Sequence, residues 1–75
     1  MTKGQRIRKK RKEQGRSIEW LVGMVGIAEH SLSRYENDKA KDIPSEVVEK
    51  IAIALNCTPT YLMGWENWEL ATHQL

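Results

Sequence analysis

Apolar residues recur at helical spacing on both sides of Gly26. Leu21 and Val25 lie four residues apart, and Leu32 and Tyr35 lie three apart, which is the spacing of a helix with one buried face. The apolar residues of this pattern are Leu21, Val22, Val25, Ile27, Leu32 and Tyr35. Because glycine readily adopts the positive φ that ends a helix at a steep turn, the pattern predicts two short helices, 18–25 and 28–36, joined at Gly26.

Three further helices are predicted from the remaining polar and apolar pattern. The polar stretch 3–14 consists of strong helix formers and stops at Gly15. Segment 46–55 carries apolar residues at helical spacing, and a fifth short helix runs up to Gly64. The sequence therefore predicts an all-α, compact five-helix domain over residues 1–65, with residues 66–75 as a C-terminal tail.

The residues that flank these segments suggest how each helix begins. Ser17 and Ser45 precede predicted helices and are expected to cap their free amides, whereas Ala28 offers no capping oxygen to helix 28–36. Thr58 and Pro59 form a cap and first-turn pair for the fifth helix.

Composition limits the class of protein. The chain has 75 residues, enough for one small domain, and no apolar run approaches the ~20 residues that span a bilayer. Its single cysteine, Cys57, cannot form an internal disulfide, which fits the cytoplasm. His30, His73 and Cys57 form no nucleophile–base pattern, and metal-ligand spacing and phosphate-binding glycine loops are absent from the sequence. We expect neither enzyme activity, nor a metal, nor a cofactor.

Charge is distributed unevenly along the chain. Residues 1–16 contain eight of the twelve lysines and arginines but only one of the ten carboxylates. Such a basic block favours a polyanionic partner for one face of the domain. The alternative is a basic helix that is merely solvated.

Two short helices at a steep angle are the plan of a helix-turn-helix, whose second helix enters the DNA major groove. From about Arg6 to Trp65 the chain resembles the helix-turn-helix family of phage repressors, Cro proteins and their bacterial relatives. The similarity is densest in the segments LSRYEN (32–37) and YLMG (61–64). It implies a lambda-repressor-like fold and a transcriptional regulator, foremost a phage-type repressor, that binds palindromic double-stranded operators as a homodimer. An antitoxin, a restriction–modification controller and a protein-interaction module on the same fold are the alternatives.

The resemblance makes helix 28–36 the recognition helix. With Leu32 directed to the core, its exposed arc is expected to contact bases, as the N-terminal residues of such helices do. The predicted base contacts are Glu29, His30, Ser31 and Arg34. Arg34 can donate two hydrogen bonds to guanine, and Glu29 can accept one from the amino group of cytosine. Alternatively, Glu29 only stabilises the helix through its negative charge near the positive N-terminal end.

Phosphate contacts are expected around this helix. The candidates are Ser17, Ser33, Asn37, Lys39, Lys41 and Arg6. Two positions depart from the family pattern, since Ile18 replaces a phosphate-binding glutamine and Asp38 replaces a glycine. The resemblance further implies a buried ion pair between Arg11 and Glu36, although both could instead be surface charges.

Two groups of apolar residues have no place in the predicted core. Ile18, Trp20 and Met24 lie close together on helix 18–25, where they could bind an antirepressor or another regulatory protein; the alternative is packing within this chain. Trp65 and Trp68 in the tail could form a dimer contact, pack on the domain, or lead into a linker to a larger regulatory half.

Overall fold

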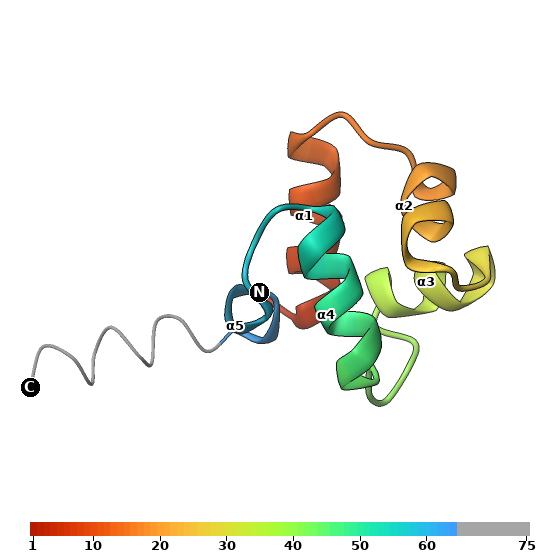
Figure 1. Ribbon diagram of the computed structural model, residues 1–75. Helices are drawn as coiled ribbons and strands as arrows, with labels where there is room; N and C mark the ends of the chain where they lie inside the picture. Colours follow the sequence, from red (N-terminus) through yellow and green to blue (C-terminus); the bar gives the residue numbers. More distant parts are fainter. Residues whose placement is uncertain (65–75) are drawn as a thin grey trace, which may run out of the picture.

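The computed structural model describes residues 1–64 and contains five helices in that part of the chain (Figure 1). They are α1 (Lys3–Glu13), α2 (Ile18–Val25), α3 (Glu29–Glu36), α4 (Ser45–Ala54) and α5 (Pro59–Met63). Residues 1–64 form no strand, so the predicted all-α fold with five helices is confirmed. The proposed boundary at residue 65 and the tail lie outside the described residues.

Most helix ends follow the local sequence as predicted. Ser17 Oγ accepts a hydrogen bond from the backbone N–H of Trp20 at 3.1 Å and so caps α2. Gly26 ends α2 with φ +80°, and Gly64 ends α5 with the same φ. Thr58 caps α5, while α3 begins after Ala28 without a side-chain cap. These five predictions are confirmed.

The predicted cap of the fourth helix is wrong. Ser45 is the first residue within α4, and Pro44 occupies the N-cap position without a side-chain hydrogen bond. The carbonyl oxygen of Pro44 accepts from the N–H groups of Val47 and Val48, both at 3.0 Å. Helical hydrogen bonding therefore begins one residue earlier than expected, since proline's fixed φ suits the approach to a helix even though it offers no capping oxygen.

The core is built from all five helices. Its buried residues are Ile7, Leu21, Val25, Leu32, Val48, Ile51, Ala52, Leu55 and Leu62. The central helix α4 contacts both α2 and α5, and α1 contacts both α3 and α5. In Figure 1, α3 and α5 lie at opposite sides of this arrangement. Burial of nine small to medium side chains holds the domain together, and α3 contributes only Leu32 to them.

The polar helix α1 is held against α3 by its two ends. Near its start, buried Gly4 allows close approach, because a Cβ atom there would overlap the carbonyl oxygen of Tyr35. Near its end, Arg11 pairs with Glu36. Ile7 lies between them and is fully buried. With a single large apolar side chain in the core, α1 depends on these contacts for its place in the fold.

Candidate nucleic-acid interface

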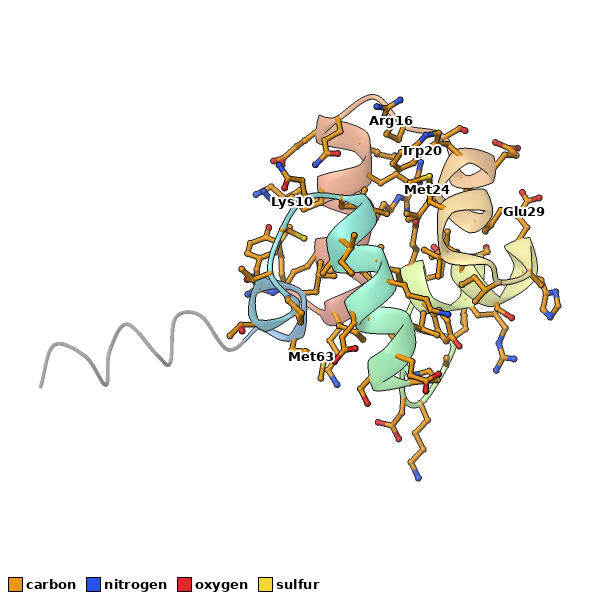
Figure 2. All side chains as sticks on the ribbon, in the orientation of Figure 1. Lys10, Arg16, Trp20, Met24, Glu29 and Met63 are labelled. Atoms are coloured by element: carbon orange, nitrogen blue, oxygen red, sulfur yellow. The ribbon has the colours of Figure 1, made fainter. Side chains whose placement is uncertain are left out.

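The polar side chains of α3 divide into an outer and an inner set. Glu29, His30 and Arg34 are exposed, and Figure 2 shows Glu29 directed away from the body of the domain. Within residues 1–64 these three side chains form no hydrogen bond or ion pair. Ser31 is half-buried beside them. The four predicted base contacts thus share one arc of α3, and three of their side chains are available to a partner.

The inner side of α3 is held by an ion pair that is almost fully buried. Arg11 Nε donates to Glu36 Oε2 at 2.8 Å and Arg11 Nη2 donates to Glu36 Oε1 at 2.9 Å, with side-chain exposures of 12% and 4%. The hydrogen bond to Glu36 raises the pKa of Arg11 above its usual value, against the lowering effect of burial. This two-point contact fixes the end of α3 relative to α1.

Arg11 also holds the connection between α1 and α2. Its Nη1 donates to the carbonyl oxygen of Arg16 at 2.9 Å. One guanidinium therefore joins the end of α1, the loop before α2 and the end of α3. The Arg11 side chain therefore helps to position both α2 and α3.

The loop after α3 continues the exposed arc. Asn37 Nδ2 donates to the carbonyl oxygen of Ser33 at 2.9 Å and to Ser33 Oγ at 3.3 Å, so these two candidate phosphate contacts are linked to each other. Lys39 and Lys41 are exposed in the loop. A shallow depression lined by Ser31, Arg34, Tyr35 and Ala40 connects the helix with the loop. The exposed lysines thus lie in the loop that directly follows the predicted base contacts of α3.

Arg6 lies apart from this stretch. Its guanidinium carbon is 5.3 Å from the centre of the Tyr61 ring, and Lys10 Nζ is 5.0 Å from the same centre. A Cβ atom on Gly64 would lie 3.4 Å from Arg6 Nε. Arg6 therefore faces α5, which lies on the opposite side of the domain from α3 (Figure 1), and cation–π contact with Tyr61 accounts for its position.

Of the three apolar residues of α2 predicted as a partner surface, two pack against the core and one is exposed. Trp20 and Ile18 are half-buried against the core, and the guanidinium carbon of Arg16 lies 4.5 Å from the centre of the Trp20 ring. Met24 is 57% exposed. It lines a groove with Lys50, Ile53 and Ala54 of α4, and Figure 2 shows it on the side of α2 toward α4. Trp65 and Trp68 lie outside the described residues.

Comparison with known protein families identifies the family of this chain. Residues 4–67 match the family described as helix-turn-helix domain. The chain belongs to the helix-turn-helix family. The turn of this helix-turn-helix is Gly26 to Ala28, and α3 is its second helix. No curated protein matches the chain in sequence.

Solved structures of other helix-turn-helix proteins are similar to this one. SinR, the master regulator for biofilm formation, in complex with DNA shares 31% identity with a TM-score of 0.77, over 81% of this chain and 97% of that chain. The P22 c2 repressor with a synthetic operator shares 29% identity with a TM-score of 0.78, over 88% and 98%. A SinR–SinI complex shares 28% identity with a TM-score of 0.79, over 93% and 74%. These similarities support a DNA-binding transcriptional regulator.

Two features of this helix-turn-helix domain escaped the sequence analysis. Ile53 of α4 is 80% exposed next to Met24, although it belongs to an apolar helix pattern. Thr2 Oγ1 donates to Asp38 Oδ2 at 2.8 Å across 36 residues of sequence. The spacing of Thr2 and Gln5 is that of a capping box and identifies the start of α1, but no local pattern links Thr2 to Asp38.

Neither a membrane-spanning helix nor a metal site is found among the described residues. None of the helices within residues 1–64 combines the length and apolar character needed to cross a membrane. The same residues contain no group of three or more His, Cys, Asp or Glu side chains that could hold a metal ion.

Proposed function

We propose that this chain is a sequence-specific transcriptional repressor that contacts operator bases through α3. The observation that carries the proposal is the division of α3 into an inner side held by Leu32 and Glu36 and an outer arc whose side chains have no partner within residues 1–64. Recognition helices of this family present their N-terminal residues to base edges. In this role the protein is a regulator rather than an enzyme.

Each residue of the outer arc has a proposed role. Arg34 donates two hydrogen bonds to the O6 and N7 atoms of a guanine, and Glu29 accepts from the amino group of a cytosine. His30 and Ser31 form single hydrogen bonds with a base or a phosphate. Arg34 thus contributes most to discrimination among sequences, by about 1–3 kcal/mol.

Phosphate contacts complete the interface. Lys39 and Lys41 neutralise phosphates next to the recognition helix, and Ser17, Ser33 and Asn37 donate hydrogen bonds to the DNA backbone. Such contacts set the register of the protein on DNA without selecting a sequence. Arg6 is a weaker candidate because its guanidinium lies over Tyr61.

We further propose that two copies bind a palindromic operator in the bacterial cytoplasm. The support is the family and the operator complex of the P22 c2 repressor. Two copies would contact half-sites about one helical turn apart. Trp65 and Trp68 are the proposed dimer contact.

The test is selection from a random DNA library, followed by affinity for the selected sequence over a salt series. We expect an enriched palindrome and an affinity that falls steeply as salt rises, because phosphate contacts release counterions. Binding without sequence preference would contradict the proposal. Sedimentation of the complex measures the number of copies per operator.

A second function, binding of a regulatory protein, is favoured by the exposure of Met24 and Ile53. The SinR–SinI complex shows that a similar protein binds a protein partner. Trp20 lies four residues before Met24 on α2 and is half-buried. Replacing Met24 by glutamate should abolish such binding and leave the operator affinity of the free protein unchanged; retention of every natural partner by this variant would exclude the surface.

A further inference from the structure

The hydroxyl of Thr2 connects the start of α1 to the loop that follows the recognition helix. Thr2 Oγ1 accepts from the N–H of Gln5 at 3.1 Å and donates to Asp38 Oδ2 at 2.8 Å. The N–H of Thr2 in turn donates to Gln5 Oε1 at 3.0 Å. One hydroxyl therefore uses its donor and its acceptor capacity at once, capping α1 and holding Asp38.

Asp38 determines the direction in which the chain leaves α3. Its φ is +58°, in the left-handed region that short polar residues tolerate better than most. Its N–H donates to the carbonyl oxygen of Tyr35 at 3.3 Å, and the N–H of Lys39 donates to that of Arg34 at 2.8 Å. The position of Lys39 thus follows directly from the conformation of Asp38.

Close packing keeps Thr2 within reach of Asp38. A Cβ atom on Gly4 would lie 2.8 Å from Asp38 Oδ1 and 2.9 Å from the carbonyl oxygen of Glu36. The first turn of α1 therefore lies directly on the end of α3. Because Thr2 is the N-cap of α1, the Asp38 carboxylate also lies near the positive end of that helix, which stabilises it there.

We propose that Thr2 is a positioning residue for DNA binding: through Asp38 it fixes loop 37–41 in the conformation in which Lys39 and Lys41 reach phosphates. This inference rests on the proposed function. Thr2 itself need not touch DNA. It explains how the loop keeps a defined position with aspartate where the family has glycine, since the hydrogen bond from Thr2 selects one conformation of the turn.

Two substitutions of Asp38 test the role of this hydrogen bond. Asp38→Asn and Asp38→Gly remove the same negative charge, and both residues suit a positive φ. Only the asparagine oxygen can still accept from Thr2. Operator and non-operator DNA should both bind the Asp38→Gly variant roughly three- to tenfold more weakly than the Asp38→Asn variant, which corresponds to one hydrogen bond. Fluorescence anisotropy with labelled DNA measures the ratio.

A charge-matched exchange provides the second test. Thr2→Asp keeps a capping oxygen but places a second carboxylate against Asp38, and we expect weaker binding of all DNA sequences with little loss of thermal stability. Adding Asp38→Asn returns the net charge to that of the wild type and supplies an amide that donates to the new carboxylate. The double variant should recover most of the wild-type affinity.

The outcomes separate the two proposals. A wild-type protein that binds no DNA sequence refutes the proposed function and this inference with it. Wild-type binding combined with equal affinities of the Asp38→Asn and Asp38→Gly variants refutes the inference alone, as does a double variant that remains as weak as Thr2→Asp. A purely structural role of Thr2 would change the melting temperature without changing these affinity ratios.

Discussion

Helices α1 and α3 are both rich in polar residues, and in each helix some of these residues contact a neighbouring helix while others are exposed without a partner within residues 1–64. In α1, Arg6 and Lys10 lie over Tyr61 and Arg11 pairs with Glu36. In α3, the side chains of Glu29 and Arg34 form no hydrogen bond or ion pair within residues 1–64. Charge on a helix surface therefore does not itself indicate an interface. Within residues 1–64, α3 combines a buried, paired Glu36 at its end with exposed Glu29 and Arg34 that have no such partner.

Removing Glu36 should have the largest effect, a loss of folding stability. Glu36→Ala strands the Arg11 guanidinium, and loss of one partner of a buried pair costs about 3–5 kcal/mol of the free energy of unfolding. Urea denaturation measures the loss. Glu29→Ala on the outer arc is the matched control and should change stability by less than about 0.5 kcal/mol. Similar losses for both variants would show that the two sides of α3 are not distinct.

Removing Arg34 should affect binding instead of stability. Arg34→Ala should lower operator affinity by about 1–3 kcal/mol and relax selectivity at one base position, while the melting temperature stays unchanged because the side chain has no partner in the described fold. Competition with operators altered at single positions measures the selectivity. An equal loss on operator and random DNA would assign Arg34 to a phosphate.

Removing Lys39 should weaken binding uniformly. Lys39→Ala removes one phosphate contact, so the slope of log affinity against log salt should become shallower by about 0.9. Titrations at several salt concentrations on operator and random DNA provide the slope. An unchanged slope would mean that Lys39 remains hydrated in the complex.

The smallest effect is expected for Arg6. Arg6→Ala removes a cation–π contact with Tyr61, which contributes about 0.5–1 kcal/mol to stability at such sites, and operator affinity should be nearly unchanged. Thermal unfolding and anisotropy measured on the same preparation test both parts. A loss of affinity with a shallower salt slope would instead restore Arg6 to the phosphate contacts.

The part of the fold that sequence predicted is the part that short-range chemistry determines. Gly26 must adopt a positive φ to join two helices at this angle, and Ser17 and Thr58 carry capping oxygens one residue before their helices. The same rule predicted a cap at Ser45, and that prediction was wrong. Helical hydrogen bonding begins at the carbonyl oxygen of the preceding Pro44. When two neighbouring residues could each occupy the N-cap position, residue types alone do not show which one does.

Long-range contacts were predicted only where a family resemblance supplied them. The pairing of Arg11 with Glu36 spans 25 residues and came from that resemblance. The hydrogen bond between Thr2 and Asp38 spans 36 residues, and neither the resemblance nor the periodicity indicated it. The position of Arg6 was likewise unpredictable, since a basic residue on a basic helix can turn to either neighbour, and Tyr61 on α5 determined the outcome.

The exposed arc of α3 can vary without disturbing the core. Leu32 and Glu36 hold the helix in place from the inner side, so Glu29, His30 and Arg34 can be replaced together at almost no energetic cost to folding. Under selection, mutations there can alter the preferred operator without first requiring a compensating mutation in the core. Under the proposed function, a lineage carrying this fold can change its operator preference through this arc alone, and an engineer can use the same three positions as a library.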